Sequence, residues 1–232
     1  MKDLGRIGVI VAARMGSVRL PGKALKPLQG IPMLGFLLRR LQSSRYADEI
    51  ILATSQRADD DVLADLAIRE EVAVHRGELE DVTARYIGAA AKYNIDTVVR
   101  VTGDCPFVDG ELTDYCLNAA SISGSFDLCT TKGRFPIGLD VEIYRNDVMV
   151  QLHRGNELSV EQREHLTLYL YHNRDKFRLV EISPQREWVG ADGTYTIDTV
   201  EDYAKAVAWA AGFDTPLFTV AQLMALERVS GT

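Results

Sequence analysis

Residues 9–25 read VIVAARMGSVRLPGKAL, and this stretch indicates how the fold begins. Its apolar start belongs to a run over residues 7–13 that is continuous rather than alternating, as in a parallel strand covered on both faces. The run ends at a loop that carries Arg14, Arg19 and Lys23 among glycines and a proline. Glycines let backbone amides approach a ligand, so this loop predicts an anion site. The alternative is that the glycines only turn the chain and the cations are only solvated.

Strands and helices alternate from this first strand to residue 123. We expect strands at 7–13, 49–54, 72–76 and 97–104, and helices at 33–43, 59–71 and 81–93. Alternation at this spacing predicts an α/β sheet with right-handed crossovers.

The pattern becomes richer in strands after residue 123. We expect strands at 126–131, 139–144, 177–183 and 194–198, and helices at 159–173, 199–212 and 219–229, with Thr199 as the N-cap of the second helix. These predictions describe one domain over residues 1–232 with a strand-rich insertion at about 125–160.

The charge of the chain is unevenly distributed. The net charge is −7, which argues against a general nucleic-acid binder, because such proteins need a broad basic surface. Residues 4–47 nevertheless contain eight Lys or Arg and no Asp or Glu. A local basic patch on an acidic protein fits a small polyanion such as a nucleoside triphosphate.

The cysteines and the apolar runs indicate in which compartment we expect the protein. The three cysteines have no CxxC spacing, which is typical of reduced thiols in a cytoplasmic protein. No apolar run approaches the ~18–20 residues that a membrane span needs, so we expect neither a membrane segment nor a membrane partner.

The anion loop does not match the common phosphate-binding motifs. No GxGxxG follows the strand, and five residues rather than four separate Gly16 from Gly22. Ala24 also stands where a P-loop has the Ser or Thr that holds magnesium. The loop is therefore a phosphate loop of another kind, or no phosphate loop.

Two aspartates follow predicted strands and are candidate metal ligands. Asp104 lies in TGDCPFVD (102–109), and Asp198 lies in TYTIDTVEDY (194–203). Ligands in open α/β sheets lie beyond the carboxyl ends of the strands, and Mg²⁺ usually takes one or two carboxylates plus phosphate oxygens. The alternatives are that Asp104 caps a turn and that Asp198 is only an acid before a helix.

Several motifs together resemble the cytidylyltransferases that activate acidic sugars such as 3-deoxy-manno-octulosonate and N-acylneuraminate. They are AARMGSVRLPGKAL, DVTARY, VVRVTGDCPFVD, FPIGLDVEIY, REHLT and YTIDTVEDY, and the resemblance covers about residues 6–205. The likeness is greatest to the branch named for spore coat polysaccharide biosynthesis protein F. The resemblance implies a nucleotide-diphospho-sugar-transferase-like fold, a Rossmann-like mixed sheet sandwiched by helices.

The resemblance also implies CTP as donor, a sugar acceptor, Mg²⁺ as cofactor and a homodimer, in which the insertion would serve dimerisation. It implies catalytic roles for Arg14, Lys23, Asp104 and Asp198, the last two as metal ligands. The nucleotide-binding residues implied are Ala12, Ala13, Arg14, Gly16, Ser17, Arg19, Lys23, Thr102 and Gly103. The acceptor residues implied are Asp140, Glu142, Arg163 and His165. The octulosonate enzymes have a GDEP-type stretch where this chain has Cys105 after Asp104, which leaves the acceptor open.

The expected reaction is attack of a sugar oxygen on the α-phosphorus of CTP with release of pyrophosphate, in the biosynthesis of a surface polysaccharide or glycan. The alternatives are a nucleotidyltransferase that uses another nucleoside triphosphate or a sugar-phosphate acceptor, a glycosyltransferase of similar fold, and a non-catalytic nucleotide-binding protein. Glycosyltransferases of this fold usually place Asp-x-Asp at the metal strand, where this chain reads Gly103-Asp104-Cys105.

Overall fold

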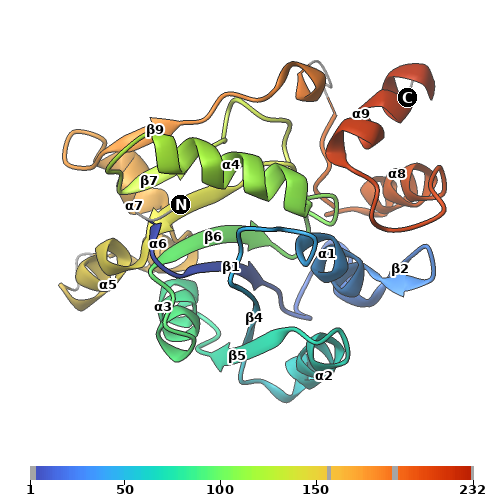
Figure 1. Ribbon diagram of the computed structural model, residues 1–232. Coiled ribbons are helices and arrows are strands. Elements are labelled where there is room, and N and C mark those ends of the chain that lie inside the picture. The colour runs from blue at the N-terminus through green and yellow to red at the C-terminus, as the bar shows by residue number, and fades with distance from the viewer. Residues whose placement is uncertain (1–3, 156–157, 190–192, 231–232) are drawn as a thin grey trace.

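The structure, a computed structural model, describes residues 4–155, 158–189 and 193–230. Among these residues, seven strands form one sheet in the order β5-β4-β1-β6-β8-β7-β9 (Figure 1). They are β1 (Ile7–Ala12), β4 (Glu49–Ser55), β5 (Ala73–Gly77), β6 (Thr97–Thr102), β7 (Leu128–Thr130), β8 (Glu142–Arg145) and β9 (Leu179–Glu181). Strands β5, β4, β1 and β6 run parallel to one another, whereas β8 is antiparallel to β6 and β7. A small antiparallel ribbon joins β2 (Pro27–Leu28) to β3 (Ile31–Pro32).

Helices cover both faces of this sheet (Figure 1). Val9 and Val11 of β1 belong to the core that includes residues of α1 and α4, whereas Ile10 belongs to the core that includes residues of α3 and α5. Both faces of β1 are thus buried, which is why its sequence is continuously apolar. The helices are α1 (Met33–Leu41), α2 (Asp61–Arg69), α3 (Val82–Lys92), α4 (Gly110–Ile122), α5 (Asn146–Arg154), α6 (Val160–Glu164), α7 (Leu168–His172), α8 (Val200–Ala210) and α9 (Val220–Ser230).

The predicted α/β fold is confirmed, and each strand and helix expected before residue 105 is present with slightly moved ends. Helix α8 begins as expected, because the Thr199 side chain accepts a hydrogen bond from the backbone of Asp202. Helices α4 and α5 lie in segments for which the sequence analysis specified no element.

The prediction of one helix over 159–173 is wrong. The chain forms the two short helices α6 and α7, with His165 between them in a non-helical conformation at φ −100° and ψ 73°. The break accompanies a tertiary contact, because the Thr167 hydroxyl and the Tyr171 hydroxyl both donate to the buried carboxylate of Glu142, which is distant in the chain. Apolar periodicity alone does not reveal such an interruption.

The prediction of a strand at 194–198 is also wrong. This segment is not part of the sheet, and two backbone hydrogen bonds tie it to distant loops: Tyr195 N–H donates to Ile137 O, and Ile197 N–H donates to Asp104 O. Gly138, at φ +86°, lies so close to the backbone of Thr196 that a Cβ atom at this position would collide with it. The segment therefore packs against the loops at the carboxyl end of the sheet instead of extending it.

The segment predicted as a strand-rich insertion at 125–160 contains β7, β8 and α5, and both strands belong to the main sheet. Residues 156–157 of that range lie outside the described residues. No helix among the described residues has both the length and the apolar character that crossing a bilayer requires.

Candidate active site

A cavity of about 420 Å³ lies at the carboxyl ends of β1 and β6. These strands are paired so that Ala12 lies beside Thr102, and the loops that follow them diverge from that point. Gly103 makes the close approach possible, because its N–H donates to Ala12 O at 2.9 Å and a Cβ would lie only 2.8 Å from that of Ala13. The lining residues come from five stretches of the chain and are Ala12, Ala13, Arg14, Gly16, Ser17, Val18, Arg19, Lys23, Ala24, Val82, Arg85, Arg100, Thr102, Gly103, Asp104, Glu164, His165 and Asp198.

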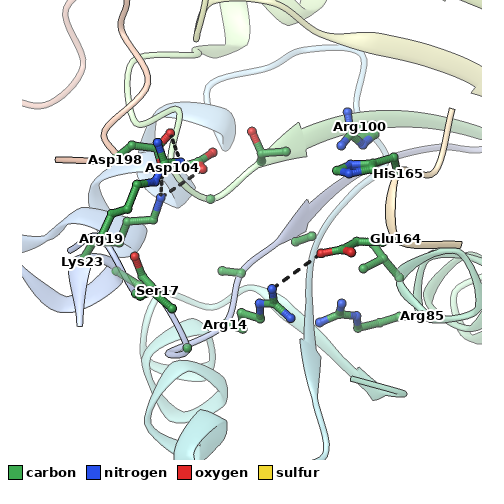
Figure 2. Close-up of a pocket in the computed structure, with 18 residues that line it drawn as sticks. Arg14, Ser17, Arg19, Lys23, Arg85, Arg100, Asp104, Glu164, His165 and Asp198 are labelled. Carbon is green, nitrogen blue, oxygen red and sulfur yellow. Dashed lines mark hydrogen bonds and ion pairs between the residues drawn. The ribbon is translucent and has the colours of Figure 1, made fainter. Parts of the chain in front are cut away.

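The anion loop and the two candidate metal ligands meet on one side of this cavity (Figure 2). Lys23 Nζ donates to Asp104 Oδ2 at 3.0 Å and to Asp198 Oδ1 at 2.9 Å. Arg19 Nη2 forms an ion pair with the other Asp198 oxygen at 2.8 Å. Burial would raise the pKa of the Asp104 carboxyl, but the attraction of Lys23 and its hydrogen bond hold that pKa below the ordinary value of 3.8.

Backbone contacts bring the two aspartates together. The Asp104 carbonyl accepts from Ile197 N–H at 2.8 Å, so the residue before Asp198 is fixed against the loop that carries Asp104. The N–H of Asp198 donates to the carboxylate of Asp202, which also completes the capping box of α8 with Thr199. Asp198 therefore lies at a helix start, as one alternative held, and its side chain also lines the cavity.

The donor set fits a Mg²⁺ ion in part. The carboxylates of Asp104 and Asp198 lie within hydrogen-bond distance of the same nitrogen, so one cation can contact both. No group of three or more His, Cys, Asp or Glu side chains in the described parts of the chain is arranged to hold a metal. Two carboxylates with phosphate oxygens and waters are a usual Mg²⁺ shell, and a bound triphosphate would supply those oxygens.

Different cations face the other side of the cavity (Figure 2). Arg14 forms a long ion pair of 3.8 Å with Glu164 at the end of α6. Arg85 of α3 is only 3% exposed, and its guanidinium has no hydrogen bond or ion pair with any described residue. Burial lowers the pKa of Arg85, and the nearby positive charge of Arg14 lowers it further. Two cations held this close indicate that this part of the cavity suits an anion or another strong acceptor.

Arg100 lines the cavity near His165 (Figure 2), and Glu142, outside the lining, forms an ion pair with it. Arg100 Nη1 donates to Glu142 Oε2 at 2.5 Å, and Lys132 Nζ lies 3.3 Å from the same oxygen. Burial would raise the pKa of Glu142, but these two cations and the hydroxyls of Thr167 and Tyr171 hold the pKa below its ordinary value. Glu142 is thus an ionised anchor, and Arg100 is the member of the pair that reaches the cavity.

The residues expected to contact an acceptor are dispersed. Of the four, His165 alone lines the cavity. Glu142 is 1% exposed behind Arg100, and Asp140 accepts from the backbone of Gly138 in a turn. Arg163 points to Asp81, at 2.7 Å, and joins α6 to the start of α3. All the residues expected to bind the nucleotide line the cavity.

The sequence analysis missed Arg100 and Glu164. The sequence could have singled out Arg100, because it is the one charged residue in the apolar run TVVRVT at 97–102, which forms a buried strand. Charged side chains are rarely buried without a partner or a function. Glu164 had no such signal, since an acid in a short polar helix is ordinary.

Several known proteins resemble this chain in sequence and in fold. A family model described as cytidylyltransferase matches residues 8–228. Spore coat polysaccharide biosynthesis protein SpsF of Bacillus subtilis is 32% identical over 223 residues, which covers 94% of this chain and 92% of that protein. A solved cytidylyltransferase from Leptospira borgpetersenii superposes with a TM-score of 0.91 at 31% identity, over 97% of this chain and 95% of that one. A CMP-2-keto-3-deoxy-manno-octonic acid synthetase, solved in complex with CTP, shares the fold, with a TM-score of 0.68 at 18% identity over 90% of this chain and 99% of that one.

Proposed function

The chain belongs to the cytidylyltransferase family, and on that basis we propose that it transfers CMP from CTP to an acidic sugar, with release of pyrophosphate, for a surface polysaccharide or glycan. One observation carries the proposal: Lys23, Asp104 and Asp198 converge in the same cavity as Arg14 and the glycine-containing loop. A cationic loop that faces two carboxylates suits a triphosphate together with a divalent ion.

The donor would be held by the cations of the loop. CTP brings about four negative charges, and each interacts with a cation ~4 Å away by about 4 kcal/mol at an effective dielectric constant of ~20, before desolvation is subtracted. Arg14 and Arg19 can grip phosphate oxygens through two N–H groups each, whereas Lys23 acts as a point charge. The choice of CTP is supported by the family and by the CTP complex of the octonic acid synthetase.

The reaction needs no protein nucleophile. A hydroxyl oxygen of the acceptor forms a bond to the α-phosphorus of CTP, the bond from that phosphorus to the β-bridging oxygen breaks, and pyrophosphate leaves with the bond's electrons. The hydroxyl proton passes to solvent. Arg14, Arg19 and Lys23 would neutralise the charge that grows on the leaving pyrophosphate, because phosphoryl-type transfer depends on positioning and electrostatics. Mg²⁺ held by Asp104 and Asp198 would polarise the α-phosphate and lower the pKa of a bound hydroxyl.

The acceptor side of the cavity would be formed by Arg100 and His165. Arg100 Nη1 is engaged by Glu142, whereas Nη2 has no hydrogen bond with a described residue. An anchored guanidinium with a free N–H edge suits a carboxylate, which supports an acidic sugar as acceptor. Glu142 would then act as a positioning residue that orients Arg100.

A nucleotide and acceptor panel tests the proposal. We expect calorimetry with Mg²⁺ to give tighter binding of CTP than of UTP, ATP or GTP. We expect pyrophosphate release from CTP with an acidic sugar of the octulosonate or neuraminate type, and none with sugar 1-phosphates. Preference for another triphosphate would overturn the choice of donor, and release with a sugar 1-phosphate would favour the alternative acceptor class.

Variants of the two aspartates test the metal assignment within the same assay. Asp104→Asn should abolish pyrophosphate release with little change in thermal stability, and Asp198→Asn should raise the Mg²⁺ concentration needed for half-maximal rate. Glu201→Gln is the matched control, because Glu201 is an exposed acid three positions beyond Asp198 that does not line the cavity. An unaltered Mg²⁺ titration for Asp198→Asn would leave Asp198 with a structural role only.

A further inference from the structure

The hydrogen-bond donors of Lys23 are already fully used within the protein. Its ammonium group has three N–H bonds. Nζ lies 3.0 Å from Asp104 Oδ2, 2.9 Å from Asp198 Oδ1 and 2.9 Å from the carbonyl oxygen of Ile197. Lys23 in this position has no donor left for a phosphate oxygen.

The position of the ammonium group is the one that a metal ion would need. Mg²⁺ bound by Asp104 and Asp198 must lie between the same two carboxylates that Lys23 Nζ now joins. Two cations cannot share that space, because like charges at contact distance repel strongly in a partly buried site. Lys23 and a divalent ion are therefore alternative occupants.

Charge balance explains why the arrangement is stable. The two carboxylates carry two negative charges, and Lys23 and Arg19 together supply two positive charges. The Arg19 side chain is 67% exposed and can leave the pair readily, whereas the Lys23 side chain is only 15% exposed. Lys23 is thus the more firmly held of the two counter-ions.

We propose that Lys23 is an internal counter-ion that occupies the metal position until a nucleotide arrives. The triphosphate then draws the ammonium group away along its flexible four-carbon stem, and the divalent ion takes its place between Asp104 and Asp198. Lys23 thereby couples metal entry to nucleotide binding. This inference rests on the proposed function, because it assumes the metal and the triphosphate of that reaction.

Titration of the nucleotide-free protein with Mn²⁺, followed by electron paramagnetic resonance, tests the competition directly. Removal of a competing positive charge should strengthen Mn²⁺ binding, so we expect Lys23→Met to bind Mn²⁺ at least about tenfold more tightly than the wild type. Lys26→Met is the matched control, because Lys26 lies over the Tyr203 ring and does not line the cavity. It should bind Mn²⁺ as the wild type does.

A double variant locates the new binding. Asp198→Asn in the Lys23→Met background should remove the gain. If Lys23→Met melts too low to titrate, Lys23→Gln repeats the test, because its amide keeps a hydrogen-bond donor without the charge. Unchanged or weaker Mn²⁺ binding in the Lys23 variant would overturn the inference, as would a gain that survives Asp198→Asn. Failure of the proposed function would be seen separately, as wild-type protein that releases no pyrophosphate from CTP.

Discussion

The cations of the cavity differ sharply in how well the protein satisfies them. Lys23 has three acceptors, Arg14 has a single ion pair of 3.8 Å, and the Arg85 guanidinium has no partner among the described residues. Burial of an unpaired charge destabilises a fold, so such a residue is expected where function requires it. We therefore expect ligand binding and stability to oppose each other at Arg85.

Replacement of Arg85 tests this opposition. Arg85→Met keeps the apolar stem but removes the buried charge, so we expect an unchanged or raised melting temperature together with at least about tenfold weaker CTP binding by calorimetry. Arg39→Met is the control, because Arg39 pairs with Glu70 away from the cavity and should leave CTP affinity unaltered. Loss of stability without loss of CTP affinity would show that Arg85 serves packing instead.

At the scale of the elements, Glu142 explains how the strands and the broken helix are joined. It lies at the start of β8 and accepts from Arg100 on β6 and from the hydroxyls of Thr167 and Tyr171. One carboxylate thus ties the sheet to α7 and to the turn that carries His165. This arrangement positions Arg100 and His165 on the proposed acceptor side of the cavity, although Glu142 does not itself line the cavity.

The stability contributed by Glu142 should depend on pH. Its pKa in the folded protein lies below the ordinary 4.5, so its contribution is present above that value and is lost as the pH falls through the folded pKa. Glu142→Gln should lower the free energy of unfolding by about 3–5 kcal/mol near neutral pH, because it leaves Arg100 and Lys132 without their counter-charge. The difference from the wild type should shrink in acid.

Urea denaturation at a series of pH values measures this difference. Glu181→Gln is the control on strand β9 of the same sheet, because the Glu181 carboxylate forms exposed ion pairs with Arg134 and Arg174, and such pairs contribute little to stability. A loss for Glu142→Gln that is equally large at acid and neutral pH would contradict an ionised Glu142.

At the scale of the whole molecule, the basic cluster in residues 4–47 proves to be a cluster in sequence more than in space. Only Arg14, Arg19 and Lys23 from it line the cavity. Arg40 is fully buried and donates to backbone carbonyls of the core and of the 216–218 segment. Residues from distant parts of the chain, among them Arg85, complete the positive surface of the cavity.

A concentrated patch of cations on a protein of net charge −7 should make CTP binding sensitive to salt. An increase in ionic strength from about 0.01 M to about 0.15 M shortens the screening length from about 30 Å to about 8 Å. We expect the association rate constant for CTP, measured by stopped flow, to fall several-fold over this range. Cytidine, which carries no phosphate, is the control, and an equal salt effect on cytidine would argue against electrostatic steering.

Much of the fold was predictable because its signals are local. The continuous apolar run of β1 and the capping residues of α8 each specify an element from neighbouring residues. The two wrong predictions share one cause. The break at His165 and the extended course of 194–198 depend on Glu142, Ile137 and Asp104, which are distant in the chain.

The sequence by itself determined the alternating α/β plan, the cationic loop after the first strand and the choice of Asp104 and Asp198 as candidate ligands. These features depend on periodicity and residue type, which neighbouring positions in the chain are enough to show. Only the tertiary structure decided that Lys23 and Asp198, 175 positions apart, would touch, that Glu142 would stand behind Arg100, and that Arg85 would face Arg14. The physical reason is that a side chain's partners are set by how whole elements pack. Contacts between residues so far apart in the chain do not change the local pattern of apolar and polar residues, so that pattern cannot reveal them.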